Sequence, residues 1–109
     1  MDAIMEIANR HGIAVVEDNA HGLIGRYKGR WLGTFGRMAT QSFSRRKISP
    51  AGRGALLINE AKFLERAEII REKGTNRARF FRGQVDKYFW VNVGSSYVMS
   101  DMLATLLYG

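Results

Sequence analysis

Apolar residues in the first part of the chain follow a helical period and then form a continuous run. Residues 2–11 carry apolar side chains at helical spacing, which predicts an amphipathic helix with Asp2 as its N-cap. Gly12 stands where a left-handed residue commonly ends a helix. Residues 13–16 are apolar throughout, which is typical of a parallel strand covered on both faces. Helix, tight turn and buried strand together predict half of an α/β unit.

Glycines divide the middle of the chain into short segments. The five glycines between residues 22 and 36 predict turns, including a hairpin-like turn at residues 27–30 and another at residues 33–36. Residues 38–43 and 55–58 have the composition of two further short strands. This part of the chain is therefore expected to supply the remaining strands of a small sheet and the turns between them.

The last part of the chain returns to a helical pattern. A helix is expected over residues 59–73, with Asn59 as its cap and Gly74 as its stop. Residues 75–96 show no clear period, and an irregular stretch of that length inside a compact domain is usually functional or in contact with a partner. Residues 102–108 are expected to form a final helix.

Length and composition limit what the chain can be. With 109 residues it forms at most one domain and is too short to hold a complete site for most enzyme classes. The absence of cysteine excludes disulfides, thiolate metal sites and cysteine nucleophiles. No apolar run approaches the ~20 residues that span a bilayer, and the N-terminus does not resemble a secretion signal. We therefore expect a cytoplasmic protein without a membrane segment.

The net charge of +7 raises the question of nucleic-acid binding. Residues 77–82 read RARFFR and interleave cations with aromatic rings, as proteins that bind single strands do. The alternative is a loop whose arginines contact phosphates or carboxylates of a small ligand or of a neighbouring subunit. No helix-turn-helix, zinc-finger or RNP-type pattern accompanies the charge, so the second interpretation is favoured.

Two side chains suggest a particular chemistry. Asp18 follows the first apolar run, and ligands of parallel sheets bind beyond the carboxyl ends of the strands. Lys47 follows 29 residues later, and an acid with a lysine can hold a pyridine ring and form an imine with it. Each residue alone has an ordinary structural explanation: Asp18 as a cap or turn former, and Lys47 as part of a solvated basic turn. His21 alone would also be interpreted as structural.

Longer runs of residues resemble a known family. Residues 15–22 read VVEDNAHG and look like the VVEDAAHG of the DegT/DnrJ/EryC1/StrS sugar-nucleotide aminotransferases. Residues 68–77 read EIIREKGTNR and residues 80–88 read FFRGQVDKY, both at the spacing of that family. The resemblance covers essentially the whole chain. Its closest likeness is to the transaminases that act on dTDP-4-keto-6-deoxyglucose.

The resemblance implies an α/β fold. Residues 1–109 would be part of the large domain of a fold-type-I, aspartate aminotransferase-like enzyme with three α/β/α layers, incomplete at both ends. The parent would be a homodimer that uses pyridoxal 5'-phosphate. It would move an amino group from glutamate to the 4-keto carbon of dTDP-4-dehydro-6-deoxyglucose, as a dTDP-4-amino-4,6-dideoxygalactose transaminase does, for surface polysaccharide biosynthesis.

The resemblance also implies roles for individual residues. Asp18 would pair with the pyridine nitrogen of the cofactor, because a carboxylate there keeps that nitrogen protonated. His21 would contact the ring and Ser42 the phosphate. Lys47 would bond covalently to the cofactor and later move a proton. The residues of the loop that reaches the neighbouring subunit's active site would be Ser95, Ser96 and Tyr97.

The match to the family breaks between residues 44 and 54. The chain reads SRRKISPAGRG there, whereas the family typically has a HETKN-like string and then a GEGG turn before the next strand. We hypothesise two compensating reading-frame slips, which the nucleotide sequence tests, because restoring the frame should recover the HETKN-like string. A non-catalytic family member or a frameshifted product is therefore an alternative. The 109-residue chain alone is expected to be inactive and to bind pyridoxal phosphate weakly or not at all.

Overall fold

The computed structural model of the protein describes residues 1–43 and 53–108. The chain divides into two compact units, of which the first comprises residues 1–60 and 101–109 and the second residues 61–100. The expected site residues Asp18, His21 and Ser42 belong to the first unit. The expected interface loop belongs to the second unit.

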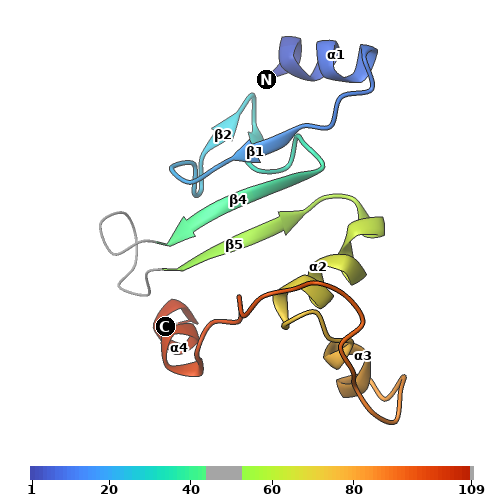
Figure 1. Ribbon diagram of the computed structural model, residues 1–109. Coiled ribbons are helices and arrows are strands. Elements are labelled where there is room, and N and C mark those ends of the chain that lie inside the picture. Colours follow the sequence, from blue (N-terminus) through green and yellow to red (C-terminus); the bar gives the residue numbers. More distant parts are fainter. Residues whose placement is uncertain (44–52, 109) are drawn as a thin grey trace. The chain divides into compact units, whose positions relative to one another are not determined.

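A three-stranded sheet forms the centre of the first unit (Figure 1). Helix α1 (Asp2–Arg10) precedes strand β1 (Val16–Asp18), and β4 (Met38–Phe43) lies between β1 and β5 (Arg53–Ile58). Strand β1 runs parallel to β4, while β5 runs antiparallel to β4. The helix followed by a parallel strand is the half of an α/β unit that the sequence predicts.

The register between β1 and β4 determines which residues meet at the edge of the sheet. Val16 lies opposite Met38, and Asp18 lies opposite Thr40. Because parallel strands point the same way, the carboxyl ends of β1 and β4 lie at one edge of the sheet. Ser42 follows two residues after Thr40 on β4, which is roughly 7 Å along the strand.

The predicted hairpin-like turn is confirmed as a small antiparallel ladder. Strands β2 (Arg26–Tyr27) and β3 (Arg30–Trp31) pair with each other. Lys28 and Gly29 connect them with φ angles of 49° and 80°. Two positive φ values in a two-residue turn match the right-handed twist of the flanking strands, and a glycine at one of the two positions makes this turn accessible.

Two expectations for the beginning of the chain are wrong. The N-cap of α1 is Met1, whereas the Asp2 carboxylate accepts a hydrogen bond from Lys28 Nζ at 2.5 Å instead of capping the helix. Strand β1 begins at Val16 rather than at residue 13, and it is not covered on both faces within the described chain, since Ile13 and Val16 are 60% and 61% exposed. An ion pair to the hairpin replaces the cap.

The second unit begins with a helix that is shorter than predicted. A 3₁₀ turn (Ala61–Phe63) leads into α2 (Leu64–Arg71), so the expected single helix over residues 59–73 is divided at its start and ends early. Asn59 does not cap it, because its side chain bonds to a loop of the first unit. Gly74 follows with a φ of 76°, in keeping with its predicted role as a stop.

The segment without a clear period contains regular structure after all. Helix α3 (Arg77–Phe81) lies within it, and isolated bridges join Thr75 to Trp90 and Glu72 to Ser96. A helix of five residues is too short to show a period, so the sequence could not reveal it. The expected last helix is confirmed as α4 (Asp101–Tyr108).

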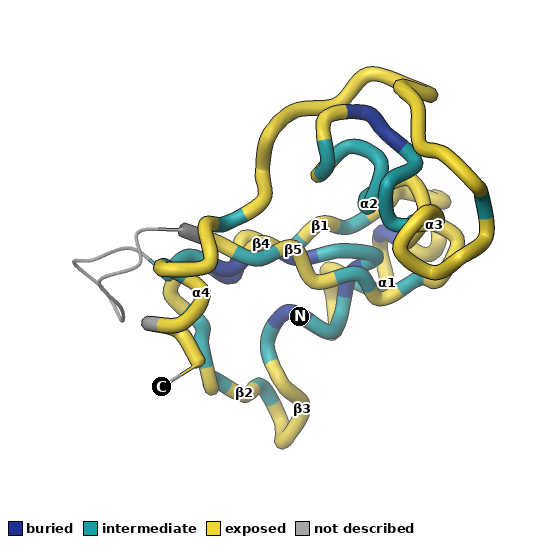
Figure 2. Tube along the Cα trace, turned by 90° about the horizontal axis from the view of Figure 1, so that it is seen from below, coloured by how far each residue is buried: buried dark blue, intermediate teal, exposed yellow. Residues whose placement is uncertain are grey.

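Few of the described residues are buried, as the scarcity of dark blue in Figure 2 shows. The buried apolar residues are Ala8 and Ala39, while Asn19, Gln41 and Thr75 are buried polar residues. Polar contacts therefore carry much of the local order in this chain. Within the described ranges, every helix is too short or too polar to cross a lipid bilayer.

Candidate functional site

Asp18 ends strand β1 and its side chain is exposed. Its Oδ1 atom accepts a hydrogen bond from the Ala20 backbone N–H at 3.1 Å. This contact is the turn-forming role that the sequence left open as an alternative. It does not bury the carboxylate, which remains accessible to a ligand at the carboxyl edge of the sheet.

Ser42 lies on the same face and edge of the sheet as Asp18. Alternation along β4 places Ala39 and Gln41, both buried, on one face, and Thr40 and Ser42 on the other. Residues in register on parallel strands point to the same side, so Asp18 shares the face of Thr40 and Ser42. The structure therefore brings together two of the side chains that the sequence assigns to one ligand.

Of the other two expected cofactor-binding residues, the structure describes His21 but not Lys47. His21 is exposed in the turn after β1, where the Gly22 N–H donates to the Asn19 carbonyl oxygen at 3.1 Å. Lys47 lies outside the described residues, so the structure does not test its position. The described strand residues nearest to Lys47 in the sequence are Phe43 on β4 and Arg53 on β5. These two residues pair with each other at the same edge of the sheet as Ser42.

The expected interface loop is ordered by its backbone within the second unit. Ser95 N–H donates to the Ile70 carbonyl oxygen at 2.9 Å, and the Ser95 carbonyl oxygen accepts from Lys73 N–H at 3.0 Å. Ser96 forms the bridge to Glu72, while Tyr97 is 66% exposed. An exposed aromatic ring on a backbone held in this way suits contact with a partner.

Sequence reasoning did not identify a buried pair of amides beside the site. Asn19 Nδ2 donates to Gln41 Oε1 at 2.8 Å, and both residues are more than nine-tenths buried. The same nitrogen lies 3.3 Å from the Leu32 carbonyl oxygen. A Cβ on Gly22 would overlap the Asn19 side chain, so glycine is required there. Asn19 stands where the family string has alanine, and this difference was the signal available in the sequence.

A second contact that the sequence did not reveal joins β1 to the loop before β4. The Glu17 carboxylate accepts hydrogen bonds from the N–H groups of Gly33, Phe35 and Gly36 at 2.8, 2.6 and 2.8 Å. Asn59 Nδ2 donates to the carbonyl oxygens of Gly33 and Gly36 at 3.0 and 2.8 Å. Glu17 of β1 therefore binds the N–H groups of this loop, and Asn59, directly after β5, binds its carbonyl groups.

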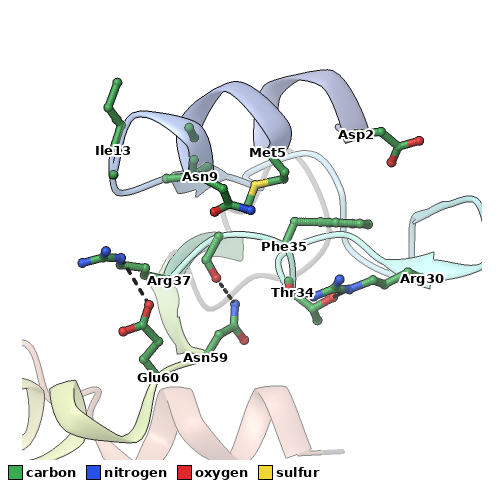
Figure 3. Close-up of a pocket in the computed structure, with 14 residues that line it drawn as sticks. Asp2, Met5, Asn9, Ile13, Arg30, Thr34, Phe35, Arg37, Asn59 and Glu60 are labelled. Carbon is green, nitrogen blue, oxygen red and sulfur yellow. Dashed lines mark hydrogen bonds and ion pairs between the residues drawn. The ribbon is translucent and has the colours of Figure 1, made fainter.

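A cavity of about 830 Å³ lies at the opposite edge of the sheet (Figure 3). Its lining includes Val15 and Gly36, which lie near the amino ends of β1 and β4, far along the strands from Asp18 and Ser42. Arg37 Nε pairs with Glu60 Oε1 at 3.2 Å in its wall. The cavity therefore does not contain the candidate site. Among the described residues, His, Asp and Glu nowhere gather in a group of three or more that could bind a metal.

The sequence of the whole chain is similar to those of known proteins. The family model described as the DegT/DnrJ/EryC1/StrS aminotransferase family matches residues 1–109. The GDP-perosamine synthase of Caulobacter vibrioides is 31% identical over 107 residues, which cover 97% of this chain and 27% of that protein. A putative pyridoxal phosphate-dependent aminotransferase of Bacillus subtilis, EpsN, is 31% identical over 105 residues, with 95% and 25% covered.

A solved structure extends the likeness to the fold. The aminotransferase from Psychrobacter cryohalolentis superposes with a TM-score of 0.83 at 25% identity, over 96% of this chain and 28% of that one. This confirms the expected fold class, part of the α/β fold of fold-type-I aminotransferases. The chain spans about a quarter of the length of the curated relatives it matches.

Proposed function

The chain belongs to the DegT/DnrJ/EryC1/StrS aminotransferase family, and we propose that residues 1–109 are part of the large, cofactor-binding domain of a sugar-nucleotide aminotransferase. The enzyme would transfer an amino group from glutamate to the 4-keto carbon of dTDP-4-dehydro-6-deoxyglucose. The EKGTNR and FFRGQVDKY runs support this substrate by resemblance. One matched relative is named for another nucleotide-linked sugar, GDP-perosamine.

The observation that carries the proposal is the parallel register of β1 and β4. It places an exposed carboxylate, Asp18, and a hydroxyl group, Ser42, on one face at the carboxyl edge of the sheet. Pyridoxal phosphate offers a basic ring nitrogen at one end and a phosphate group at another, so an acid and a hydroxyl suit it. The residues present therefore fit this cofactor. One matched relative, EpsN, is named as pyridoxal phosphate-dependent.

When bound, pyridoxal phosphate supplies a protonated pyridine ring that withdraws electrons from the reacting carbon of the substrate. Asp18 would hold the proton on the ring nitrogen, because a negative charge within a few ångströms favours the protonated form. Ser42 would donate its hydroxyl hydrogen to a phosphate oxygen. His21 would pack on the ring, which keeps the ring in a fixed plane.

Lys47 would hold the cofactor covalently through its side-chain amine and would carry a proton on that amine during amino transfer. The expected interface loop, Ser95, Ser96 and Tyr97, would contact the active site of the second subunit of a homodimer. Neither nucleic-acid binding nor a non-catalytic role is favoured by the comparisons.

The proposal is tested on the protein in its full natural length. We expect amino transfer from glutamate to dTDP-4-dehydro-6-deoxyglucose, measured by the formation of 2-oxoglutarate. Asp18→Asn should lower kcat at least about a hundredfold, since the ring nitrogen then loses its counter-charge. Asp101→Asn, which removes an exposed carboxylate in the first turn of α4, is the matched control and should leave kcat unchanged.

Two results would contradict the proposal. Asp18→Asn with undiminished kcat would remove the assignment of the carboxylate to the cofactor. Faster turnover of a GDP-linked 4-keto-6-deoxyhexose than of the dTDP-linked sugar would support the assignment as an aminotransferase but contradict the proposed preference for a dTDP-linked substrate.

A further inference from the structure

The buried amide pair connects the neighbours of the two candidate cofactor-binding residues. Asn19 directly follows Asp18, and Gln41 directly precedes Ser42. The Asn19 side chain therefore bonds from the end of β1 to the interior of β4, on the face away from Asp18 and Ser42. The backbone makes a second link at the same place, where Asn19 N–H donates to the Thr40 carbonyl oxygen at 3.0 Å.

The pair is not the arrangement that stability alone would favour. Gln41 Nε2 is buried and has no hydrogen-bond acceptor among the described residues. A buried donor without a partner costs stability, and an apolar side chain of the same shape would avoid that cost. Each such group in a native structure calls for an explanation, and fixing one geometry is a known use of buried polar networks.

The surroundings of the pair restrict movement of the strand end. Asn19 also bonds to the Leu32 carbonyl oxygen, which ties the end of β1 to the segment after the hairpin. Gly22 leaves no side chain in the way of Asn19, so the turn carrying His21 folds against this amide. A slip between β1 and β4 would break the side-chain bond as well as the backbone bond.

We propose that Asn19 and Gln41 are positioning residues that act through Asp18 and Ser42, holding the carboxylate and the hydroxyl at the spacing that the cofactor requires. This proposal rests on the proposed function. It assigns a role to two residues that do not touch the ligand and that lie on the opposite face of the sheet. A rigid second layer of this kind is what holds a binding group in its productive geometry.

The test uses Gln41→Met in the protein in its full natural length, freed of cofactor and titrated with pyridoxal phosphate. Methionine fills the volume of glutamine and removes the unpaired Nε2, but it also removes the acceptor of one Asn19 Nδ2–H bond, so the two effects on the unfolding midpoint should largely cancel. The Kd for pyridoxal phosphate should nevertheless rise roughly tenfold, the effect of losing about one hydrogen bond of positioning. Amide hydrogen exchange at Asn19 should accelerate in the cofactor-free protein, because its N–H closes the strand pairing.

Asn59→Ala is the matched control. Asn59 also makes two side-chain hydrogen bonds, to the carbonyl oxygens of Gly33 and Gly36, but at the opposite edge of the sheet. Its loss should lower the unfolding midpoint and leave the Kd unchanged. The double variant with Asn19→Ala and Gln41→Met should raise the Kd no more than Asn19→Ala alone, because Asn19→Ala already breaks the bond to Gln41 together with the bond to the Leu32 carbonyl oxygen.

The outcomes separate this proposal from the proposed function. If Asp18→Asn raises the Kd and Gln41→Met does not, the positioning role is wrong while the cofactor assignment stands. If Asp18→Asn leaves the Kd unchanged, the cofactor assignment itself is wrong. If the effects of Asn19→Ala and Gln41→Met on the Kd were additive in free energy, the proposed joint role of the two amides would also be wrong, since they would then act separately.

Discussion

The carboxylate of Glu17 accepts a hydrogen bond from the backbone N–H of Gly36 at 2.8 Å, across the start of the parallel strand pair. The same carboxylate also accepts from Gly33 and Phe35. Glu17 faces away from Asp18, its neighbour on β1, because side chains alternate along a strand. One strand therefore uses two adjacent carboxylates differently: Glu17 holds a loop, while Asp18 is exposed at the carboxyl edge of the sheet, where we propose that the cofactor binds.

Replacing Glu17 by alanine should destabilise the first unit by about 3 kcal/mol, because three N–H groups lose a charged acceptor. Faster amide exchange at Gly33, Phe35 and Gly36 would report the loss locally, and denaturant unfolding would report it globally. The control is Glu6→Ala, since Glu6 forms an ion pair with Arg10 at 2.8 Å between two well-exposed side chains of α1. That change should cost no more than about 0.5 kcal/mol. Equal effects of the two variants would show that the loop does not depend on Glu17.

Gly36→Ala should be far more harmful than Gly12→Ala. A Cβ on Gly36 would overlap the carbonyl oxygen of Val15, a backbone atom that cannot move without breaking its bond to Arg37 N–H. A Cβ on Gly12 would meet nothing within 4 Å, so only its φ of 65° opposes the change, at about 1 kcal/mol. We expect Gly36→Ala to lower the unfolding free energy by more than about 3 kcal/mol. Similar unfolding curves for the two variants would contradict this account.

The second unit should lose stability in acid through one ion pair. Both oxygens of Glu68 accept hydrogen bonds from Arg82 at 2.8 Å, and these bonds hold the pKa of Glu68 below its usual 4.5. Because the folded pKa is depressed, this contribution is fully present above pH 4.5 and is lost as the pH falls through the folded value. The protection of the α3 amides from hydrogen exchange, relative to the intrinsic exchange rate at each pH, should therefore fall in that window.

Arg82→Gln should remove this acid-dependent loss of protection and give the α3 amides, already at neutral pH, the lower protection that the unaltered protein shows in acid. Arg79→Gln is the control, because Arg79 makes a single contact of 3.4 Å with Glu65, between side chains that are 49% and 61% exposed. The control should retain the pH dependence of the unaltered protein. An unchanged pH profile in Arg82→Gln would show that another group titrates there.

The 109-residue chain by itself should bind pyridoxal phosphate weakly or not at all. The matched relatives are about four times as long, and a site shared with further chain segments or a second subunit is incomplete without them. Titration followed by the visible absorbance of a lysine-bound cofactor tests this, with free lysine and pyridoxal phosphate as the reference. A stoichiometric visible band in the short chain would contradict the expectation.

The sequence predicted most of the elements and part of the site. Strand β4, the hairpin turn and helix α4 were expected from composition and turn chemistry, which are local properties. The roles of Asp2 and Asn59 were mispredicted as caps, because both side chains bond to segments distant in the sequence. Helix α3 was missed, since five residues carry too little pattern.

What the sequence determined by itself was the family, the order of the elements and the identity of the candidate residues, because these follow from local patterns and from runs such as VVEDNAHG. Only the tertiary structure decided that Asp18 and Ser42 share one face, that Asn19 bonds to Gln41, and that Glu17 holds a loop. These relations depend on strand register and on hydrogen bonds between residues 16 to 22 positions apart, whose formation no local pattern encodes.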